Sequence, residues 1–326
     1  PAAYGTEKFM DYGFMEAMMR STTLPARDLW YSEGHINYYY GGQYFAVFLT
    51  KLSHTKVELT YNLMRTFVAG LAFAMPFSLV YQMMSDRMKG QQKSEKVIKG
   101  LPFAAGFTAG TAVSIAGNMH YVIYAQIIPL IEKLTGKEVS SYWFPDATRY
   151  IGYNPYREED RTIHEFPCYS FVLGDLHAHV VNIMFVLLVI ALLYVWLRGV
   201  RKKTVPVETS MKDGKFWKEQ LLMTHLLVIS ALLGMFQWTN FWDFVIYYVV
   251  TLGTVLFANI IRFQGKIKKI MVVTFAQMAE IYLLAYLVIL PFTLQFDTMV
   301  DGIGIAKYHS YFYQLLVLWG LPAVLT

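Results

Sequence analysis

The sequence predicts an all-helical, multi-pass membrane protein, and two observations support this prediction. Apolar residues make up 56% of the 326 residues and charged residues only 16%, whereas a soluble domain normally has about 25% charged residues. The chain also contains several apolar stretches of roughly 20 residues, the length that a helix needs to cross a bilayer. One cysteine, Cys168, excludes an internal disulfide.

Seven apolar segments are predicted to span the membrane, the last of them truncated. They are 57–84, 100–128, 171–197, 221–238, 241–261, 270–292 and a segment that starts at Tyr311. The second is long and rich in glycine, so an alternative is a stop near Gly117 followed by an interfacial helix to Ile131. Residues 1–56 are then an external segment with interfacial helices, and 57–326 form the bundle, which includes an outer loop at 129–170.

The basic residues predict the orientation of the chain, because cytoplasmic loops carry an excess of Lys and Arg. Three linkers are basic. Their cations are Arg87, Lys89, Lys93, Lys96 and Lys99; Arg198, Arg201, Lys202, Lys203, Lys212, Lys215 and Lys218; and Arg262, Lys266, Lys268 and Lys269. The remaining segments are therefore predicted to lie on the extracytoplasmic side of the membrane. They are the external segment, the loop 129–170, the turn at 239–240 and the loop 295–310. The net charge of +5 belongs to these linkers and does not indicate a nucleic-acid partner.

The ends of the chain lead to a further expectation. The sequence opens with PAAYGTEKFMDYGF, without the basic start and apolar core of a signal peptide, and it ends inside an apolar run. An external first segment also requires a preceding span. We therefore expect the chain to be one region of a longer membrane protein, with further segments or subunits around it.

Before the first predicted span, the sequence predicts two short helices at the membrane surface. The stretch EKFMDYGFMEAMMRS places Phe14, Met18 and Met19 at helical spacing. A second helix is predicted at 41–52, too short to cross a bilayer, and a turn at 53–56 follows it. Asp11 lies near the start of the first helix, where the helix dipole favours a carboxylate. It is therefore either a first-turn acid that stabilises the helix or a catalytic base at the membrane surface.

The segment EFPCYSFVLGDLHAHVV holds the densest group of chemically active side chains. Asp175, His177 and His179 occupy every second position, so all three would share one face of a strand, whereas on a helix only Asp175 and His179 would. The motif is predicted at the outer end of a span, where an ionised carboxylate needs polar partners or a wet cavity. Three interpretations stay open: a substrate-phosphate contact, a divalent metal site and a structural polar cluster.

The other predicted outer segments add aromatic and acidic candidates. Tyr38, Tyr39 and Tyr40 follow Asn37 and precede a Gly-Gly pair, which allows a tight turn or a close approach to a ligand. We expect at least one tyrosine to pack under the interfacial helix and at least one to face the same cavity as Asp11. The remaining candidates are Glu165, Trp242 and Asp243.

Taken in order, these motifs resemble the GT-C superfamily of polyprenyl-phosphate-sugar-dependent glycosyltransferases. The chain in that superfamily contains, in this order, an acidic residue, a small-residue helix with an Arg, a Tyr-rich turn, a short helix and a span. The matching residues here are Asp11, Ala17, Arg20, Tyr38, Tyr39, Tyr40, Leu49, Arg65 and Tyr81. More closely, INYYYGGQY, EFPCYSFVLGDLHAHV and NFWDF resemble DUF2298, a membrane family with a YYY motif, over essentially the whole chain.

This resemblance implies a GT-C-like helical bundle that transfers a sugar, with inversion, from a polyprenyl-phosphate donor on the extracytoplasmic side of the plasma membrane. Asp11 would be the catalytic base. The substrate would contact Asn37, Tyr38, Tyr39, Tyr40, Glu165, Asp175, His177, His179, Trp242 and Asp243. A divalent ion held by Asp175, His177 and His179 is the one cofactor expected, and the partners are the lipid-linked donor, an acceptor and membrane lipids. A transporter or channel, or a non-catalytic subunit of a membrane complex, is the rival interpretation.

Overall fold

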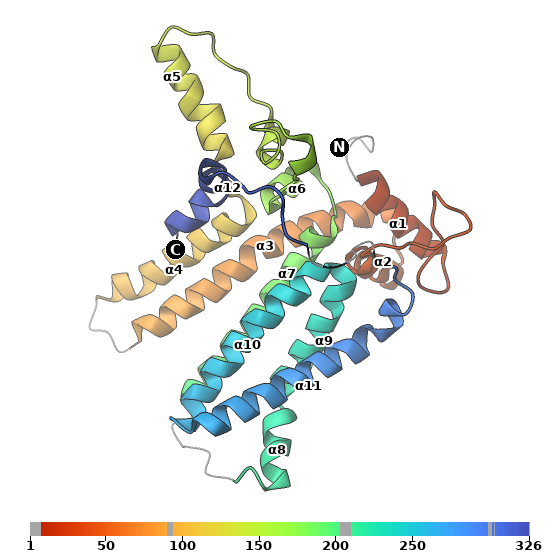
Figure 1. The fold of residues 1–326 in the computed structure, drawn as a ribbon, viewed down its shortest axis with the longest axis vertical. Coiled ribbons are helices and arrows are strands. Elements are labelled where there is room, and N and C mark those ends of the chain that lie inside the picture. Colours follow the sequence, from red (N-terminus) through yellow and green to blue (C-terminus); the bar gives the residue numbers. More distant parts are fainter. Residues whose placement is uncertain (1–7, 90–93, 203–209, 299–301, 303, 326) are drawn as a thin grey trace. The chain divides into compact units, whose positions relative to one another are not determined.

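The computed structural model describes residues 8–89, 94–202, 210–298, 302 and 304–325 (Figure 1). These residues form helices, joined by turns and two isolated β-bridges, which confirms the predicted all-helical class. Lys93 and Lys203, two cations of the predicted cytoplasmic linkers, lie outside the described residues.

Four of the described helices are long and apolar enough to cross a membrane. They are α3 (Val57–Met88), α7 (Ala178–Lys202), α10 (Phe241–Phe263) and α11 (Ile267–Thr293). A fifth span is possible if α8 (Gly214–Leu221) and α9 (Thr224–Thr239), which meet at an angle of 50°, form one bent span. The structure therefore contains a multi-pass bundle with fewer spans than the seven that the sequence predicts.

Two of the predicted spans account for most of this difference. The segment 100–128 is not continuous: α4 (Glu95–Ser114) ends before Gly117, and a π-helix (Tyr121–Ile127) and α5 (Ile128–Leu134) follow. The alternative of a stop near Gly117 is thus confirmed. The last predicted span corresponds to α12 (Phe312–Leu325), which has only 14 residues and is shorter than a helix that crosses a bilayer.

The chain divides into two compact units by its own contacts. The first unit consists of 1–79 and 175–298, and the second of 80–174 and 299–326. In the first unit, α9 packs against α7, α10 and α11, and α10 also packs against α7 and α11 (Figure 1). Buried side chains from all four helices form its core, among them Val189, Leu233, Phe236, Val255 and Ile281. The first unit thus combines the predicted external segment 1–56 with parts of the predicted bundle 57–326, and the predicted outer loop 129–170 lies within the second unit.

The helix pair α9 and α11 is held at close range by a glycine. A Cβ atom added at Gly234 would lie 2.5 Å from the carbonyl oxygen of Ala285, so only glycine lets the two backbones come this near. Small residues serve this purpose between membrane helices, because lipid tails provide no hydrophobic force that drives helices together. Close van der Waals packing therefore replaces that force along α9 and α11.

Polar side chains join α8, α10 and α11 at the basic end of the first unit. Asn259 donates hydrogen bonds to Thr274 Oγ1 at 3.0 Å and to Gln277 Oε1 at 2.8 Å. Gln277 in turn donates to the carbonyl of Gln220 at 3.0 Å, and Arg262 donates to Gln220 Oε1 at 2.6 Å. Buried polar groups in a membrane protein must be satisfied internally, and this network satisfies them while fixing the helix ends.

The external segment of the first unit contains α1 (Lys8–Arg20) and α2 (Gly41–Leu52), and the predicted bounds of the second helix agree with the structure. The first turn of α2 lies directly on the bundle. A Cβ atom at Gly41 would come within 2.8 Å of the Trp238 ring, and one at Gly42 within 2.9 Å of Val181 Cβ. The Gly-Gly pair thus lets α2 lie against the outer ends of α9 and α7.

The second unit contains the rest of α3, the helices α4, α5, α6 (Pro167–Leu173) and α12, and two short 3₁₀ helices, Phe144–Thr148 and Glu158–Asp160. Aromatic packing dominates its loops. The His120 ring stacks on Tyr124 at 4.5 Å and meets Tyr150 edge-on. Burial lowers the pKa of His120 to about 4, so this imidazole is neutral at pH 7 and serves as an aromatic packing group.

Gly234→Ala is expected to lower stability, because the new methyl group meets backbone atoms of α11 that cannot move away. Overpacking of this kind costs about 1–3 kcal/mol. The measurement is the thermal unfolding midpoint of the purified protein in detergent. Gly253→Ala is the matched control: it also lies within a span, but its Cβ would meet no atom within 4 Å. Equal midpoints for the two variants would contradict the close packing of α9 on α11.

Candidate functional site

The strongest candidate site lies where three segments of the first unit meet at the carboxylate of Asp11. Gln43 Nε2 on α2 donates to Asp11 Oδ1 at 2.9 Å, and the backbone N–H of Leu176 donates to Asp11 Oδ2 at 3.2 Å. Asp11 is completely buried. A buried carboxylate requires such donors, because an unsatisfied one would cost far more than the hydrogen bonds return. The contact therefore fixes α1, α2 and the segment before α7 around one charged group.

Gln43 leaves one acceptor unused beside this carboxylate. Its Nε2 also donates to the carbonyl oxygen of Leu176 at 2.9 Å, and since Asp11 and Leu176 both present acceptors, the orientation of the amide is fixed by its partners. Gln43 Oε1 is buried and has no hydrogen-bond partner among the described residues. A buried polar atom of this kind requires an explanation, and a bound hydroxyl group or water would provide one.

A tyrosine from α3 completes the cluster. The Tyr61 hydroxyl interacts electrostatically with the carboxylates of both Asp11 and Asp175, and its ring meets the Tyr12 ring edge-on at 5.9 Å. Burial, together with Glu16 and Glu58, raises the pKa of Tyr12 to about 12, so this phenol stays a neutral donor at pH 7. Asp11 and Asp175 thus lie near enough to Tyr61 for their charges to act on its hydroxyl, although the two motifs are 164 positions apart in the numbering.

The GDLHAH motif forms a turn and is not part of a continuous span. Gly174 has a φ of 84° and ends α6 in the left-handed conformation, which favours glycine. Helix α7 begins at Ala178, where the carbonyl of His177 accepts from the N–H groups of Val180 and Val181. The predicted single span 171–197 is therefore two helices. The break exposes the N–H of Leu176 to Asp11, which a continuous helix would have used internally.

The two histidines of this turn lie against each other. The rings of His177 and His179 stack with centroids 5.6 Å apart, and Asp175 and His177 are buried. The described residues contain no group of three or more His, Cys, Asp or Glu side chains arranged to hold a metal ion. The structure therefore gives no geometric support to the predicted metal set of Asp175, His177 and His179.

The three consecutive tyrosines divide among three packing environments. Tyr40 is buried, with Trp238 and Phe292 edge-on to its ring at 5.6 and 5.9 Å. Tyr38 packs on Phe14 of α1, and Tyr39 on Phe296. The expected packing of one tyrosine beneath α2 is confirmed, and their contact with a substrate stays a prediction.

Asn37 and Asp243 hold backbone and helix ends at the outer side of the first unit. Asn37 exchanges two hydrogen bonds with the backbone of Asp297, at 2.9 and 3.0 Å. Asp243 Oδ2 accepts from Asn182 at 2.6 Å and from Asn240 at 2.9 Å. The neighbouring Trp242 is 63% exposed. Substrate contacts of these residues stay predictions.

Glu165 belongs to the second unit, where it lies two residues before α6 and is partly buried. The lone Cys168 follows in the first turn of that helix, and burial raises the pKa of its thiol. A raised pKa disfavours the reactive thiolate, in agreement with the packing role predicted for this cysteine. The predicted role of Glu165 in substrate binding stays a prediction.

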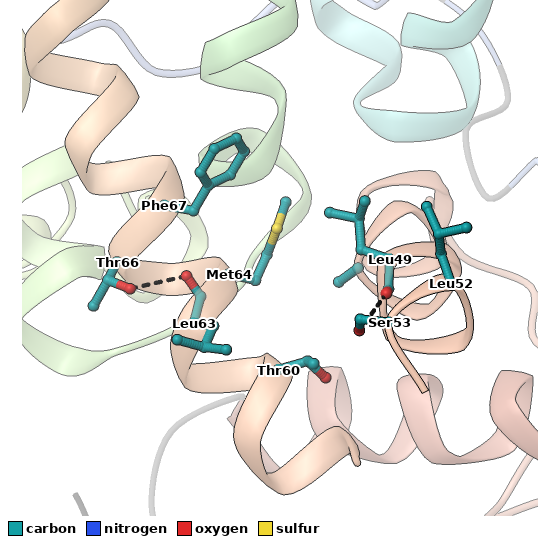
Figure 2. Close-up of a pocket in the computed structure, with 9 residues that line it drawn as sticks. Leu49, Leu52, Ser53, Thr60, Leu63, Met64, Thr66 and Phe67 are labelled. Atoms are coloured by element: carbon teal, nitrogen blue, oxygen red, sulfur yellow. Dashed lines mark hydrogen bonds between the residues drawn. The ribbon is translucent and has the colours of Figure 1, made fainter. Parts of the chain in front are cut away.

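A groove lies between α2 and α3 of the first unit. It has a volume of about 700 Å³, and Figure 2 shows Met64 and Phe67 of α3 facing Leu49 of α2 across it. Its other lining residues are Ala46, Leu52, Ser53, Thr60, Leu63 and Thr66. The groove is mostly apolar, so it offers space for an apolar chain on the same unit as the carboxylate of Asp11.

Sequence reasoning missed three residues. Gln43 and Tyr61 gave no signal, because a Gln on a short helix and a Tyr in a span are ordinary residues until their partners are known. Glu280 did give one: it lies near the middle of α11, and its Oε2 is buried without a hydrogen-bond partner among the described residues. An ionisable residue in the middle of a span is a functional candidate by default.

The fold and this site define a multi-pass helical membrane protein with a carboxylate cluster supplied by its external segments. A family model described as "Uncharacterized membrane protein (DUF2298)" matches residues 1–326. The chain therefore belongs to the DUF2298 family, as the YYY, GDLHAH and NFWDF motifs predict. Neither the curated proteins nor the solved structures provide a match to it.

Gln43→Met is expected to destabilise the external segment, because it removes the donor to Asp11 and leaves that buried carboxylate less satisfied. The cost of such an unsatisfied group is about 1–3 kcal/mol. Unfolding in mixed detergent micelles measures it. Gln126→Met removes a hydrogen bond from an exposed glutamine and is expected to change the unfolding curve little. If the unfolding curve of Gln43→Met matches that of the parent protein, burial of Asp11 does not depend on the hydrogen bond from the Gln43 amide.

Proposed function

We propose that this chain is the catalytic core of a GT-C-type glycosyltransferase, which transfers a sugar from a polyprenyl-phosphate donor to an acceptor at the extracytoplasmic face of the plasma membrane. The observation that carries the proposal is the buried carboxylate of Asp11, held by Gln43 and Leu176 beside Asp175. A carboxylate fixed by two donors, in the same unit as an apolar groove, suits a reaction between a lipid-linked donor and a hydroxyl nucleophile.

In the proposed reaction Asp11 acts as the general base. The acceptor hydroxyl oxygen forms a bond to the anomeric carbon while the bond from that carbon to the donor phosphate oxygen breaks on the opposite face. The hydroxyl proton goes to Asp11, and polyprenyl phosphate leaves with the bonding electron pair, which inverts the anomeric centre. A carboxylate is a weak base, so its rate contribution depends on position, and the two protein donors fix that position.

The polar surroundings of Asp11 suit a hydroxyl acceptor and a phosphate. Gln43 Oε1, buried and unpartnered among the described residues, would accept a hydrogen bond from a sugar hydroxyl. Helix α7, 25 residues long, begins at Ala178 directly after His177, so the positive end of its dipole lies at the same turn that contacts Asp11. Helix N-termini bind phosphate by their free N–H groups and this dipole.

The groove between α2 and α3 supports the lipid-linked donor. Its lining is mostly apolar, and two of its walls, α2 and α3, also carry Gln43 and Tyr61 of the cluster. Helix α2, too short to span, would lie at the membrane surface, so a prenyl chain could enter the groove from the bilayer while its phosphate stays near the carboxylates. The basic linkers at the opposite helix ends support an extracytoplasmic site by the positive-inside rule.

Asp11→Asn is expected to lower the rate of sugar transfer by about 10²- to 10⁴-fold, the usual contribution of a general base. The measurement is radiolabelled sugar transfer from polyprenyl-phosphate donors by purified protein, with the thermal unfolding midpoint determined in parallel. Glu33→Gln, an exposed acid of the same external segment, is the control and should transfer at the parent rate. Unchanged transfer by Asp11→Asn would remove Asp11 as the base.

Leu63→Trp is expected to raise the KM for the lipid-linked donor and to leave kcat within about twofold, because the indole fills the groove without touching the carboxylates. Leu59→Trp is the matched control. Leu59 lies one turn earlier on α3 and is equally exposed, at 55% against 54% for Leu63, but it does not line the groove. If both variants raise the KM alike, the donor chain does not occupy this groove.

A further inference from the structure

Tyrosines and arginines gather on one exposed surface of the second unit. We call it the tyrosine–arginine surface, and it consists of Tyr153, Tyr156, Arg157, Arg161, Tyr308, Tyr311 and Tyr313. All five tyrosines are exposed, with fractions from 37% for Tyr153 to 64% for Tyr156. Neither the fold nor the proposed transfer reaction requires so many exposed rings at one place.

Arg157 links one half of this surface. Its guanidinium carbon lies 5.4 Å from the ring centres of both Tyr308 and Tyr311, and its Nη2 donates to the Tyr311 hydroxyl at 2.6 Å. The Tyr311 ring stacks on Tyr313 with centroids 5.7 Å apart and planes only 11° from parallel. Three rings and one cation thus form a layered, fixed array.

Arg161 repeats the arrangement in the other half. Its guanidinium carbon lies 4.7 Å from the Tyr156 ring centre and 5.4 Å from that of Tyr153, and it donates a hydrogen bond to the Tyr156 hydroxyl. Arginine carries five N–H donors, so each guanidinium keeps donors at its edge. Among the described residues, Arg157 and Arg161 form no salt bridge, although Glu158, Glu159 and Asp160 lie between them in the sequence.

The loop that carries these arginines is held in one conformation. Arg157 N donates to Gly152 O at 2.8 Å, and Thr162 N to Ile151 O at 3.2 Å. Gly152 has a φ of 76° and lies so close to the backbone of Asp160 that no side chain would fit. Asn154 O accepts from Tyr313 and Gln314, which fastens this loop to the segment 308–314. The surface is therefore preorganised, as a binding site should be.

We propose that the tyrosine–arginine surface binds a saccharide chain. A pyranose ring presents C–H groups on its faces and hydroxyl groups at its edge. Exposed phenol rings pack against such faces, while guanidinium edges, phenol hydroxyls and the Asn154 amide provide hydrogen bonds to the hydroxyls. Tyr and Arg are also enriched in protein interfaces, but every ring here lies beside a cation or a hydrogen-bonded hydroxyl, so each ring edge presents polar groups that match the hydroxyls of a saccharide.

This inference goes beyond the proposed function and does not depend on it, since it concerns binding alone and involves none of the residues around Asp11. The loop carries both cationic and acidic side chains, so its charge does not decide whether a neutral or an acidic saccharide binds. The surface recognises instead the rings and hydroxyl groups that all saccharide chains share. Neutral chains and chains that carry carboxylates both present these groups, and the experiment distinguishes them.

The test uses the purified chain in nanodiscs on a printed array of defined oligosaccharides, one set built from neutral hexoses and one that includes hexuronic acids. Binding to at least one set is expected. Tyr156→Ala and Arg157→Gln are each expected to raise the Kd for the bound saccharide at least tenfold. Tyr31→Ala is the matched control, a tyrosine of the first unit that is 62% exposed, and its Kd should stay within twofold of the parent chain.

The outcomes are separable. Absence of binding to both sets, or retention of full binding by Tyr156→Ala, would overturn the proposal, and so would loss of binding by Tyr31→Ala to the same extent. Hydrogen exchange of residues 150–162 shows whether Arg157→Gln and Tyr156→Ala keep the loop folded, and Tyr156→Phe, which keeps the ring and removes only the hydroxyl that accepts from Arg161, carries the test if they do not: it is expected to retain most of the binding. Asp11→Asn should bind saccharide normally, so failure of the transferase proposal would leave this one intact.

Discussion

The contact between Asp11 and the backbone of Leu176 is the constraint on which the external part of the first unit depends. It joins residues 165 positions apart, and its carboxylate is completely buried. A buried charge is tolerated only with several well-placed donors, so α1, α2 and the turn before α7 must come together as one arrangement. Helix α2 carries both Gln43 of this contact and Ala46, Leu49 and Leu52 of the groove, so the contact also helps to position one wall of the groove.

The sequence predicts the local elements well and the long-range contacts poorly. Helix 41–52 could be placed because a Gly-Gly pair opens it and a polar turn at 53–56 closes it. The break after Gly174 could not, because hydropathy averages over a window and the apolar residues on both sides conceal one left-handed glycine. For the same reason 100–128 was predicted as one span. Composition also overestimates the number of spans, because an apolar stretch such as α12, with 14 residues, is too short to cross a bilayer.

The same distinction holds for the candidate site. Asp11 and Asp175 stand out in the sequence because acids are rare in an apolar chain, so residue type alone points to them. The role of Gln43 and Tyr61 in the site depends on their partners on other segments. No spacing rule connects positions 11, 43, 61 and 176. The tyrosine run shows the reverse case: an unusual motif whose described contacts are packing contacts, with Tyr40 held between Trp238 and Phe292.

The carboxylates of Asp243 and Asp11 are held by different kinds of contact. Asp243 accepts from Asn182 and Asn240, and Asn182 accepts from Thr239. These contacts lie within the bundle and close its outer end. The side chains of Thr239 and Trp238 also pack against Gly41 at the start of α2. Asp243 therefore helps to fix the helix ends on which α2 packs and, because α2 carries Gln43, the position of Asp11. The hydrogen bonds from Gln43 and Leu176 to Asp11 come from segments far apart in the sequence, so they depend on the packing of α1, α2 and the turn before α7, whereas the hydrogen bonds to Asp243 depend on the helix bundle itself.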